Sequence, residues 1–377
     1  MFAAQISSAS RYVFGAISVF FLSAILLAGE AVARSADLEK VIAGANKEGV
    51  LKILWTEDHF GADAGISAIV TAMNKHYGTN IKLQFTQGSS FPANLGRLIQ
   101  EYKSGQRSST DVFLGSANHM LAGLKTGMLM KVDWEALVER PAPKDALFDR
   151  VNPEGVGMAV ASRVVGIVYN TNLVKGADVP KSIEDVLNPK WKGQIATTPY
   201  VTGFYQLAAP DLLGEKYMTD YVTRLKPQIG GFIPCNSLDK VGSGEFAMLI
   251  FDCGRDAALR YQKTGAPIGH AVPKEAVRDN VIDLGVPANA EHPNAGKLFI
   301  AFQHTEEGQE LLWKHGNYDL EIYPGSRSKD LVDKFRAQNP DAKFELGTAQ
   351  RALMQAKQGV DIGVFQKKFQ RILRGRR

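Results

Sequence analysis

Two neighbouring apolar runs decide the fold, Gly157-Met-Ala-Val-Ala161 and Val164-Val-Gly-Ile-Val-Tyr169. Their β-branched and apolar residues predict strands. On either side, short apolar runs alternate with segments of helical periodicity, which is typical of α/β units. A further extended stretch at 281–287 leads back toward the first region. We therefore expect an α/β fold of two lobes, each a mostly parallel sheet flanked by helices, joined by a multi-strand hinge.

The alternation sets the expected elements and boundaries. Strands are predicted at 50–55, 80–86, 111–114, 194–197, 247–251 and 267–273. Helices are predicted at 37–49, 65–76, 203–213, 215–226, 294–304 and 306–315. A further helix is predicted near 95–102, and another follows the strand at 111–114 and ends near 126. Ser182 and Asp185 have the spacing of a capping box. We expect a first lobe from 37–159 plus 284–325, a second lobe from 160–283, and a C-terminal helical segment with a basic tail at 326–377.

The first 36 residues differ from the rest of the chain. Arg11 precedes an uncharged apolar run at 12–28, and the small residues of Ala31-Val-Ala33 follow. This order predicts a secretory signal peptide, and hence a protein of the periplasm. The alternative is an uncleaved membrane anchor, because the apolar run is near the lower limit of spanning length.

The net charge of +5 comes from the end of the chain. The last twelve residues carry +6 and residues 1–36 carry +1, so the body between them carries −2. A basic nucleic-acid-binding face is therefore not expected. The tail is interpreted as a solvated helix end, with contact to an anionic membrane surface as the alternative.

Cys235 and Cys253 are the only cysteines. In an oxidising compartment they can form a disulfide, and the alternative is two buried thiols. Two cysteines without a CxxC motif do not predict a metal site.

Several motifs carry a family resemblance. Residues 165–172 (Val-Gly-Ile-Val-Tyr-Asn-Thr-Asn) and 180–193 (Pro-Lys-Ser-Ile-Glu-Asp-Val-Leu-Asn-Pro-Lys-Trp-Lys-Gly) resemble the signature of extracellular solute-binding proteins of ABC importers. The similarity is to the branch that includes ferric-iron, thiamine, polyamine and phosphorylated-metabolite binders. Weaker similarities lie at 101–105, 110–115, 242–247, 293–302 and 305–308, so the resemblance spans about 38–325.

The resemblance implies a type II periplasmic binding fold that closes on a small solute. It also implies a monomer without cofactor that delivers the solute to an ABC permease and ATPase at the inner membrane. Helix N-termini after strands suit a carboxylate or phosphate, because their N–H groups are unpaired. The resemblance places seven residues in the cleft, and plain helix capping is the alternative for each: Ser89, Ser90, Ser116, Thr198, Tyr200, Thr202 and Gly203.

Three charged residues complete the candidate site. Glu57 follows the first strand, where it can coordinate a cation or accept a hydrogen bond from an amine; a solvated loop is the alternative. Asp252 and Arg255 follow a second-lobe strand. Arg255 is suited to clamp an anion, with a surface ion pair as the alternative.

The expected chemistry of the solute follows from a difference between this chain and the ferric-iron binders that it resembles. Ferric-iron binders of this branch carry adjacent tyrosines here, whereas this chain has Phe251-Asp-Cys-Gly-Arg255 and no Tyr-Tyr pair. We therefore expect an anionic solute and no metal site, and ferric iron stays an alternative. A ligand-sensing accessory protein for a membrane receptor is another alternative. No GxSxG, HExxH, Walker or strand-linked GxGxxG motif occurs, so no catalytic residue and no enzyme is expected.

Overall fold

The computed structural model describes residues 34–56 and 59–375, and the chain from Arg34 onward forms one compact unit. The predicted signal peptide therefore lies almost wholly outside the described residues. Within the described part, no helix is both long and apolar enough to cross a bilayer.

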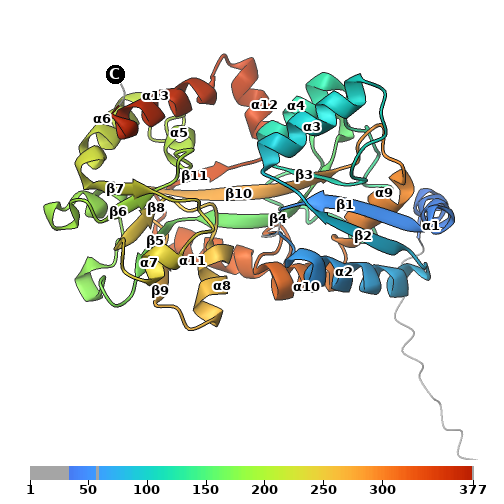
Figure 1. Cartoon of the computed structure of the whole chain (residues 1–377), viewed down its shortest axis with the longest axis horizontal. Coiled ribbons are helices and arrows are strands. Elements are labelled where there is room, and N and C mark those ends of the chain that lie inside the picture. Colours follow the sequence, from blue (N-terminus) through green and yellow to red (C-terminus); the bar gives the residue numbers. More distant parts are fainter. Residues whose placement is uncertain (1–33, 57–58, 376–377) are drawn as a thin grey trace, which may run out of the picture. The chain divides into compact units, whose positions relative to one another are not determined.

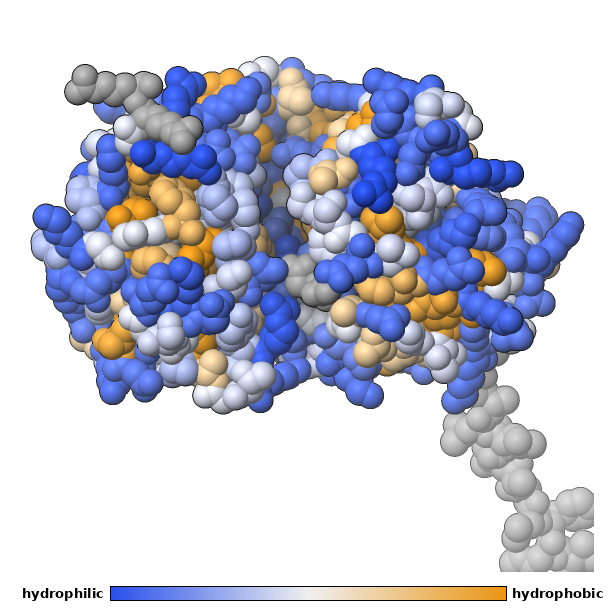
Figure 2. Space-filling model, in the orientation of Figure 1, coloured by the Kyte–Doolittle hydropathy of each residue, from blue (hydrophilic) through white to orange (hydrophobic). Residues whose placement is uncertain are grey.

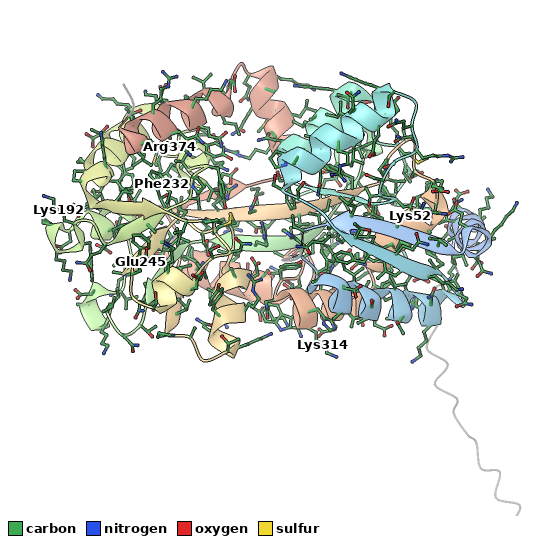
Figure 3. All side chains as sticks on the ribbon, viewed as in Figure 1. Lys52, Lys192, Phe232, Glu245, Lys314 and Arg374 are labelled. Carbon is green, nitrogen blue, oxygen red and sulfur yellow. A yellow bond between two sulfur atoms is a disulfide. The ribbon has the colours of Figure 1, made fainter. Side chains whose placement is uncertain are left out.

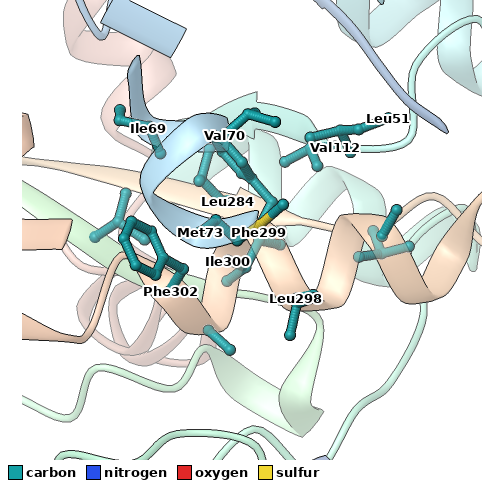
Figure 4. Close-up of a cluster of buried hydrophobic side chains, with 14 of the residues drawn as sticks. Leu51, Ile69, Val70, Met73, Val112, Leu284, Leu298, Phe299, Ile300 and Phe302 are labelled. Carbon is teal, nitrogen blue, oxygen red and sulfur yellow. The ribbon is translucent and has the colours of Figure 1, made fainter. Parts of the chain in front are cut away.

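The first lobe, as we use the term, is the set of elements packed around β1, β2 and β3. β1 and β2 pair in parallel, and helices cover them (Figure 1). Their apolar core includes Met73, Phe299 and Phe302, all without exposed surface (Figure 4). The lobe consists of α1 (Ala36–Glu48), β1 (Val50–Trp55), α2 (Ala62–Tyr77), β2 (Lys82–Gln87), α3 (Phe91–Lys103), β3 (Phe113–Gly115), α4 (Ala117–Thr126), α9 (Pro293–Phe302) and α10 (Glu306–Gly316).

The second lobe is the set of elements packed around a five-stranded sheet of order β7-β6-β8-β5-β9. β6 runs parallel to β7 and β8, whereas β5 runs antiparallel to β8 and β9. The sheet is thus mixed, and the prediction of a mostly parallel sheet was wrong for this lobe. Its elements are β5 (Ile167–Asn170), β6 (Ile195–Thr197), α5 (Phe204–Leu207), α6 (Glu215–Leu225), β7 (Ile229–Phe232), α7 (Asp239–Gly242), β8 (Met248–Ile250), α8 (Arg255–Lys263) and β9 (Ile268–Ala271).

Two long strands connect the lobes. β4 (Met158–Val165) pairs antiparallel with β10 (Ala276–Gly285), and the far end of β10 pairs with β3 of the first lobe (Figure 1). Between β4 and β5 the chain changes sheet at Gly166, where a Cβ would lie 2.4 Å from the Ala271 carbonyl oxygen. The run predicted as one strand at 164–169 is therefore two strands, because only glycine permits this close backbone approach.

Asp252 fixes the change of sheet at Gly166. The Gly166 N–H donates to Asp252 Oδ1 at 2.8 Å, and the Asp252 N–H donates to the Gly166 carbonyl at 3.1 Å. Asp252 has no exposed surface. These contacts assign it a structural role where the second lobe joins the hinge strands.

The C-terminal segment is less purely helical than predicted. It contains α11 (Arg327–Gln338), β11 (Lys343–Leu346), α12 (Ala349–Lys357) and α13 (Ile362–Arg374). β11 pairs in parallel with β10, α12 packs on α4 of the first lobe, and α13 packs on α5 and α6 of the second. The sequence did not predict β11. This strand is only four residues long, and it pairs with β10, which is distant in the sequence.

The basic tail is docked along one face. Phe369 and Leu373 of α13 are buried in the second-lobe core, while Lys367 and Arg371 are exposed. The Arg374 guanidinium lies 5.7 Å from the centre of the Phe232 ring, and its Nη2 donates to the Pro199 carbonyl (Figure 3). A solvated helix end therefore describes only the polar face of α13.

Smaller differences have local causes. The helix predicted over 203–213 is α5 alone, because Pro210 cannot continue a helix. The capping box is confirmed: Ser182 N–H donates to Asp185 Oδ2 at 2.9 Å. This capping box begins the 3₁₀ helix Ile183–Leu187. Further 3₁₀ helices among the described residues span Pro153–Gly155, Gly176–Asp178, Pro189–Trp191 and Lys226–Gln228.

Candidate ligand-binding site

A pocket lies where the hinge strand β4, α8 of the second lobe, and the ends of α10 and α11 meet. On the face drawn in Figure 2 the surface is hollowed between the two lobes. Residues of both lobes and of the hinge therefore line the pocket, and ligand sites occur preferentially at such interfaces. Its lining includes Arg163, Arg255, Asp256, Trp313, Tyr318 and Ser328.

Arg255 is the predicted site residue that lines this pocket. It is the first residue of α8 and is half-buried. Within the described residues, its guanidinium makes no hydrogen bond or ion pair. Burial lowers its pKa, since a desolvated charge without a partner is destabilised. The described residues therefore do not show the alternative, a surface ion pair, and the guanidinium is available to an anion.

Arg163 and Asp256 line the pocket beside Arg255. The Arg163 Nη1 and the Asp256 Oδ2 are 3.7 Å apart, and their side chains are 11% and 5% exposed. Among described residues, neither Arg163 Nε nor Asp256 Oδ1 has a hydrogen-bond partner. Burial raises the pKa of Asp256 above its usual value, and the nearby Arg163 charge offsets only part of this rise.

A third arginine of the pocket is already neutralised. Arg327 donates to both carboxylate oxygens of Glu310, at 2.6 and 2.8 Å, and lies 3.7 Å from Asp319 Oδ2. Arg163 has Asp256 3.7 Å away, so of the three lining arginines Arg255 alone has neither a hydrogen bond nor an ion pair among the described residues. A guanidinium group without a partner favours an anion.

The cysteines form a disulfide next to this site. Cys235 and Cys253 are joined with an S–S distance of 2.14 Å, so of the two alternatives the disulfide is confirmed. The Tyr200 hydroxyl donates to Cys235 Sγ at 2.8 Å and accepts from the Cys235 N–H at 3.0 Å. Tyr200 therefore holds the disulfide that precedes Arg255 by two residues.

The other second-lobe candidates, Thr198, Thr202 and Gly203, form hydrogen bonds within their own loop and the start of α5. Thr198 Oγ1 accepts from the Thr202 N–H at 3.0 Å, and the Gly203 N–H donates to Gln206 Oε1 at 2.9 Å. Both threonines are buried, and a Cβ on Gly203 would lie 2.3 Å from the Phe251 ring. In this conformation the loop fits the capping interpretation. Asp252, which is buried against Gly166 with His270 Nε2 3.2 Å away, is likewise out of reach of a solute.

The first-lobe candidates lie at helix starts. Ser89 and Ser90 are exposed, and the Ser90 hydroxyl makes no capping bond to α3. Ser116 begins α4, and its N–H donates to His119 Nδ1 at 3.2 Å. Burial lowers the pKa of His119 to about 4, so the ring is neutral and accepts this bond. Glu57 lies outside the described residues.

Another cavity lies within the first lobe. It is lined mainly by apolar side chains from β1, α3 and β3, such as Leu54, Phe91 and Phe113. None of the predicted site residues lines it. Its walls also carry the polar side chains Thr56, Asn94, Arg97, Ser109 and Thr110, and no second-lobe element reaches it.

Residues 34–56 and 59–375 contain no group of three or more His, Cys, Asp or Glu side chains placed to hold a metal ion. In the stretch Phe251-Asp-Cys-Gly-Arg255, Cys253 is bonded to Cys235. The Tyr261 hydroxyl, six residues after Arg255, is directed to the Asn236 carbonyl at 3.4 Å.

Sequence reasoning missed Arg163 and Asp256. Arg163 is the one charged residue in the otherwise apolar or small run of β4, which was a usable signal. Asp256 gave no such signal, because α8 itself was not predicted.

Comparisons with known proteins agree with this architecture. The family profile of bacterial extracellular solute-binding proteins matches residues 68–333. A Serratia marcescens Fe(3+)-binding periplasmic protein is 26% identical over 328 residues, covering 81% of this chain and 85% of that protein. The substrate-binding protein of an ABC transporter from Agrobacterium tumefaciens superposes with a TM-score of 0.67 at 14% identity, covering 88% and 96% of the two chains. The spermidine/putrescine-binding protein PotD of Streptococcus pneumoniae gives a TM-score of 0.61 at 16% identity, covering 85% and 99%.

The two structural neighbours establish the fold, which is the two-lobed α/β fold expected from the sequence. The family match covers well over half of the chain and concerns transport proteins rather than enzymes. The chain therefore belongs to the family of bacterial extracellular solute-binding proteins.

Proposed function

We propose that this protein captures a small anionic solute in the pocket between its lobes. As a periplasmic monomer, it then delivers the solute to an ABC permease and its ATPase in the inner membrane. The single observation that carries the anionic character is Arg255, a half-buried guanidinium that lines the pocket without a partner among the described residues. Arg163 adds a second positive charge on the same pocket.

The arrangement suggests how capture is coupled to movement. Arg163 lies on the hinge strand β4, Arg255 on α8 of the second lobe, and Trp313 on α10 of the first lobe. A solute that contacts all three favours the closed form, because it interacts with both lobes only when they are together. The permease then recognises the closed surface. In this proposal residues 37–159 plus 284–325 and residues 160–283 move as the two bodies.

Ferric iron is the second candidate, favoured by the Serratia marcescens relative. Against it, the described residues offer no cluster of carboxylate, histidine or cysteine ligands, and no adjacent tyrosines occur. A hard trivalent cation would also approach two guanidinium groups, which repel it.

A thermal-shift screen tests the proposal. The panel contains sugar phosphates, carboxylates, polyamines, thiamine and ferric citrate. A solute at about a hundred times its Kd adds roughly 2.7 kcal/mol of stability, which raises Tm by a few degrees. A selective rise with an anion is expected, whereas a rise only with ferric citrate or with polyamines would overturn the anionic assignment.

A further inference from the structure

The three charges around the pocket constrain the solute beyond its having a negative charge. We propose that the solute is a small zwitterion whose ammonium group pairs with Asp256 while its acid group, a carboxylate or a phosphate, pairs with Arg163 and Arg255. This inference rests on the proposed function, because it assigns a chemical class to the solute of that same pocket.

The first argument is the state of Asp256. It is 5% exposed, lines the pocket, and its Oδ1 has no hydrogen-bond partner among the described residues. A buried carboxylate oxygen without a donor is strongly unfavourable. An ammonium group supplies three donors and a positive charge. A solute with only an acid group would leave Oδ1 unpaired and place a second negative charge beside it.

The second argument is the separation of Arg163 and Asp256. At 3.7 Å the closest nitrogen and oxygen are too far apart for a hydrogen bond, so each group keeps unused donors or acceptors. Gly254 lies against both groups. A Cβ on Gly254 would lie 2.5 Å from Arg163 Cβ and 2.7 Å from Asp256 Oδ1, and the φ of Gly254 is 151°. Only glycine therefore leaves room for the two side chains in their observed positions.

The remaining charged neighbours of Asp256 do not replace an ammonium group. His59, Asp252 and Arg260 influence Asp256 electrostatically, but none of them makes a hydrogen bond to its Oδ1.

The test compares zwitterions with their deaminated counterparts by calorimetric titration. The pairs are glycine and acetate, β-alanine and propionate, 4-aminobutanoate and butanoate, and O-phosphoethanolamine and ethyl phosphate. Ethylamine tests an ammonium group alone. For at least one pair we expect the zwitterion to bind about tenfold or more tighter than its counterpart. The carboxylate and phosphate pairs also distinguish the two kinds of acid group.

Asp256→Asn removes the charge at nearly constant size, so it should abolish the preference within that pair while it retains binding of the deaminated anion. Retained anion binding also shows that the variant is folded. Asp256→Glu keeps the charge and should keep the preference, and Asp220→Asn, an exposed acid on α6, is the matched control.

The possible outcomes separate the two proposals. If every deaminated anion binds as tightly as its zwitterion, or if Asp256→Asn keeps the preference, the zwitterion inference is overturned while anion capture stands. If ethylamine binds and no anion does, anion capture is overturned as well.

Discussion

Arg163 and Asp256 carry opposite charges 3.7 Å apart, and both side chains are nearly buried, yet they share no hydrogen bond. Arg163 belongs to the hinge strand β4 and Asp256 to α8 of the second lobe. Desolvated charges in such an incomplete pair are costly unless a further group satisfies them. The pair therefore points to a ligand, and together with Arg255 it defines the pocket from which the predictions below follow.

Replacement of Arg255 by alanine should weaken binding of an anionic solute more than tenfold, or by more than about 1.4 kcal/mol. The reason is that Arg255 has no competing partner among the described residues, so its whole charge is available to the solute. Calorimetric titration measures the change. Arg107→Ala, an exposed arginine that lines neither cavity, should leave the Kd unchanged. An unchanged Kd in Arg255→Ala would remove Arg255 from the site.

Loss of the disulfide between Cys235 and Cys253 should lower the free energy of unfolding by roughly 3 kcal/mol in the chain-entropy account of a loop of this size. Urea unfolding of the double variant Cys235→Ser/Cys253→Ser measures this. We also expect weaker solute binding, because Cys253 precedes Arg255 by two residues and Tyr200 is held by Cys235. If the solute binds the double variant with wild-type affinity, the disulfide does not position this loop.

Asp283 should make stability depend on pH. It is fully buried on β10, accepts from Asn152 Nδ2 at 3.1 Å, and burial raises its pKa to about 7. The unfolded carboxyl has a pKa of about 3.9, so it releases its proton first as pH rises. The contribution of Asp283 to stability is therefore largest below about pH 4 and is lost by about pH 7.

Asp283→Asn isolates this effect from other titrating groups. Relative to wild type, the variant should gain stability as pH rises from about 4 to about 7, by an amount on the order of a few kcal/mol. Urea unfolding at a series of pH values measures the difference, with the exposed Asp341→Asn as control. A constant difference between Asp283→Asn and wild type over this range would show that Asp283 does not titrate there.

The docked face of α13 should contribute to stability. Phe369 has no exposed surface and packs into the second-lobe core, so Phe369→Ala should cost about 3–5 kcal/mol. Val364 on the same helix is 56% exposed, and Val364→Ala should change the free energy of unfolding little. Equal effects of the two substitutions in thermal or urea unfolding would contradict the packing of α13 on this lobe.

The general fold could be predicted because its signals are local. β1 was predicted with its observed bounds, Val50–Trp55, and the ends of α4 and α6 were within one residue, since these elements follow from apolar spacing and capping residues. The change of sheet at Gly166 was missed, because it depends on the distant carboxylate of Asp252. β11 was missed for the same reason, since its pairing with β10 is a long-range contact.

The site was harder to predict than the fold. Arg255 was identified from its position after a strand, but most of the predicted Ser and Thr side chains lie in loops away from the pocket. Thr198 illustrates the cause, because a hydroxyl that caps its own loop and one that binds a solute occur in the same sequence context. Arg163 and Asp256 become a pair only when β4 and α8 come together in three dimensions.

The most direct test of the account is a calorimetric titration of the anion that gives the largest thermal shift, into wild type and into Arg163→Ala/Arg255→Ala. The account predicts one binding site per chain in the wild type. It also predicts a loss of affinity in the double variant that exceeds the loss in either single variant, with the thermal unfolding of all three variants still cooperative. Wild-type affinity in a folded double variant would contradict the claim that these two guanidinium groups capture the solute.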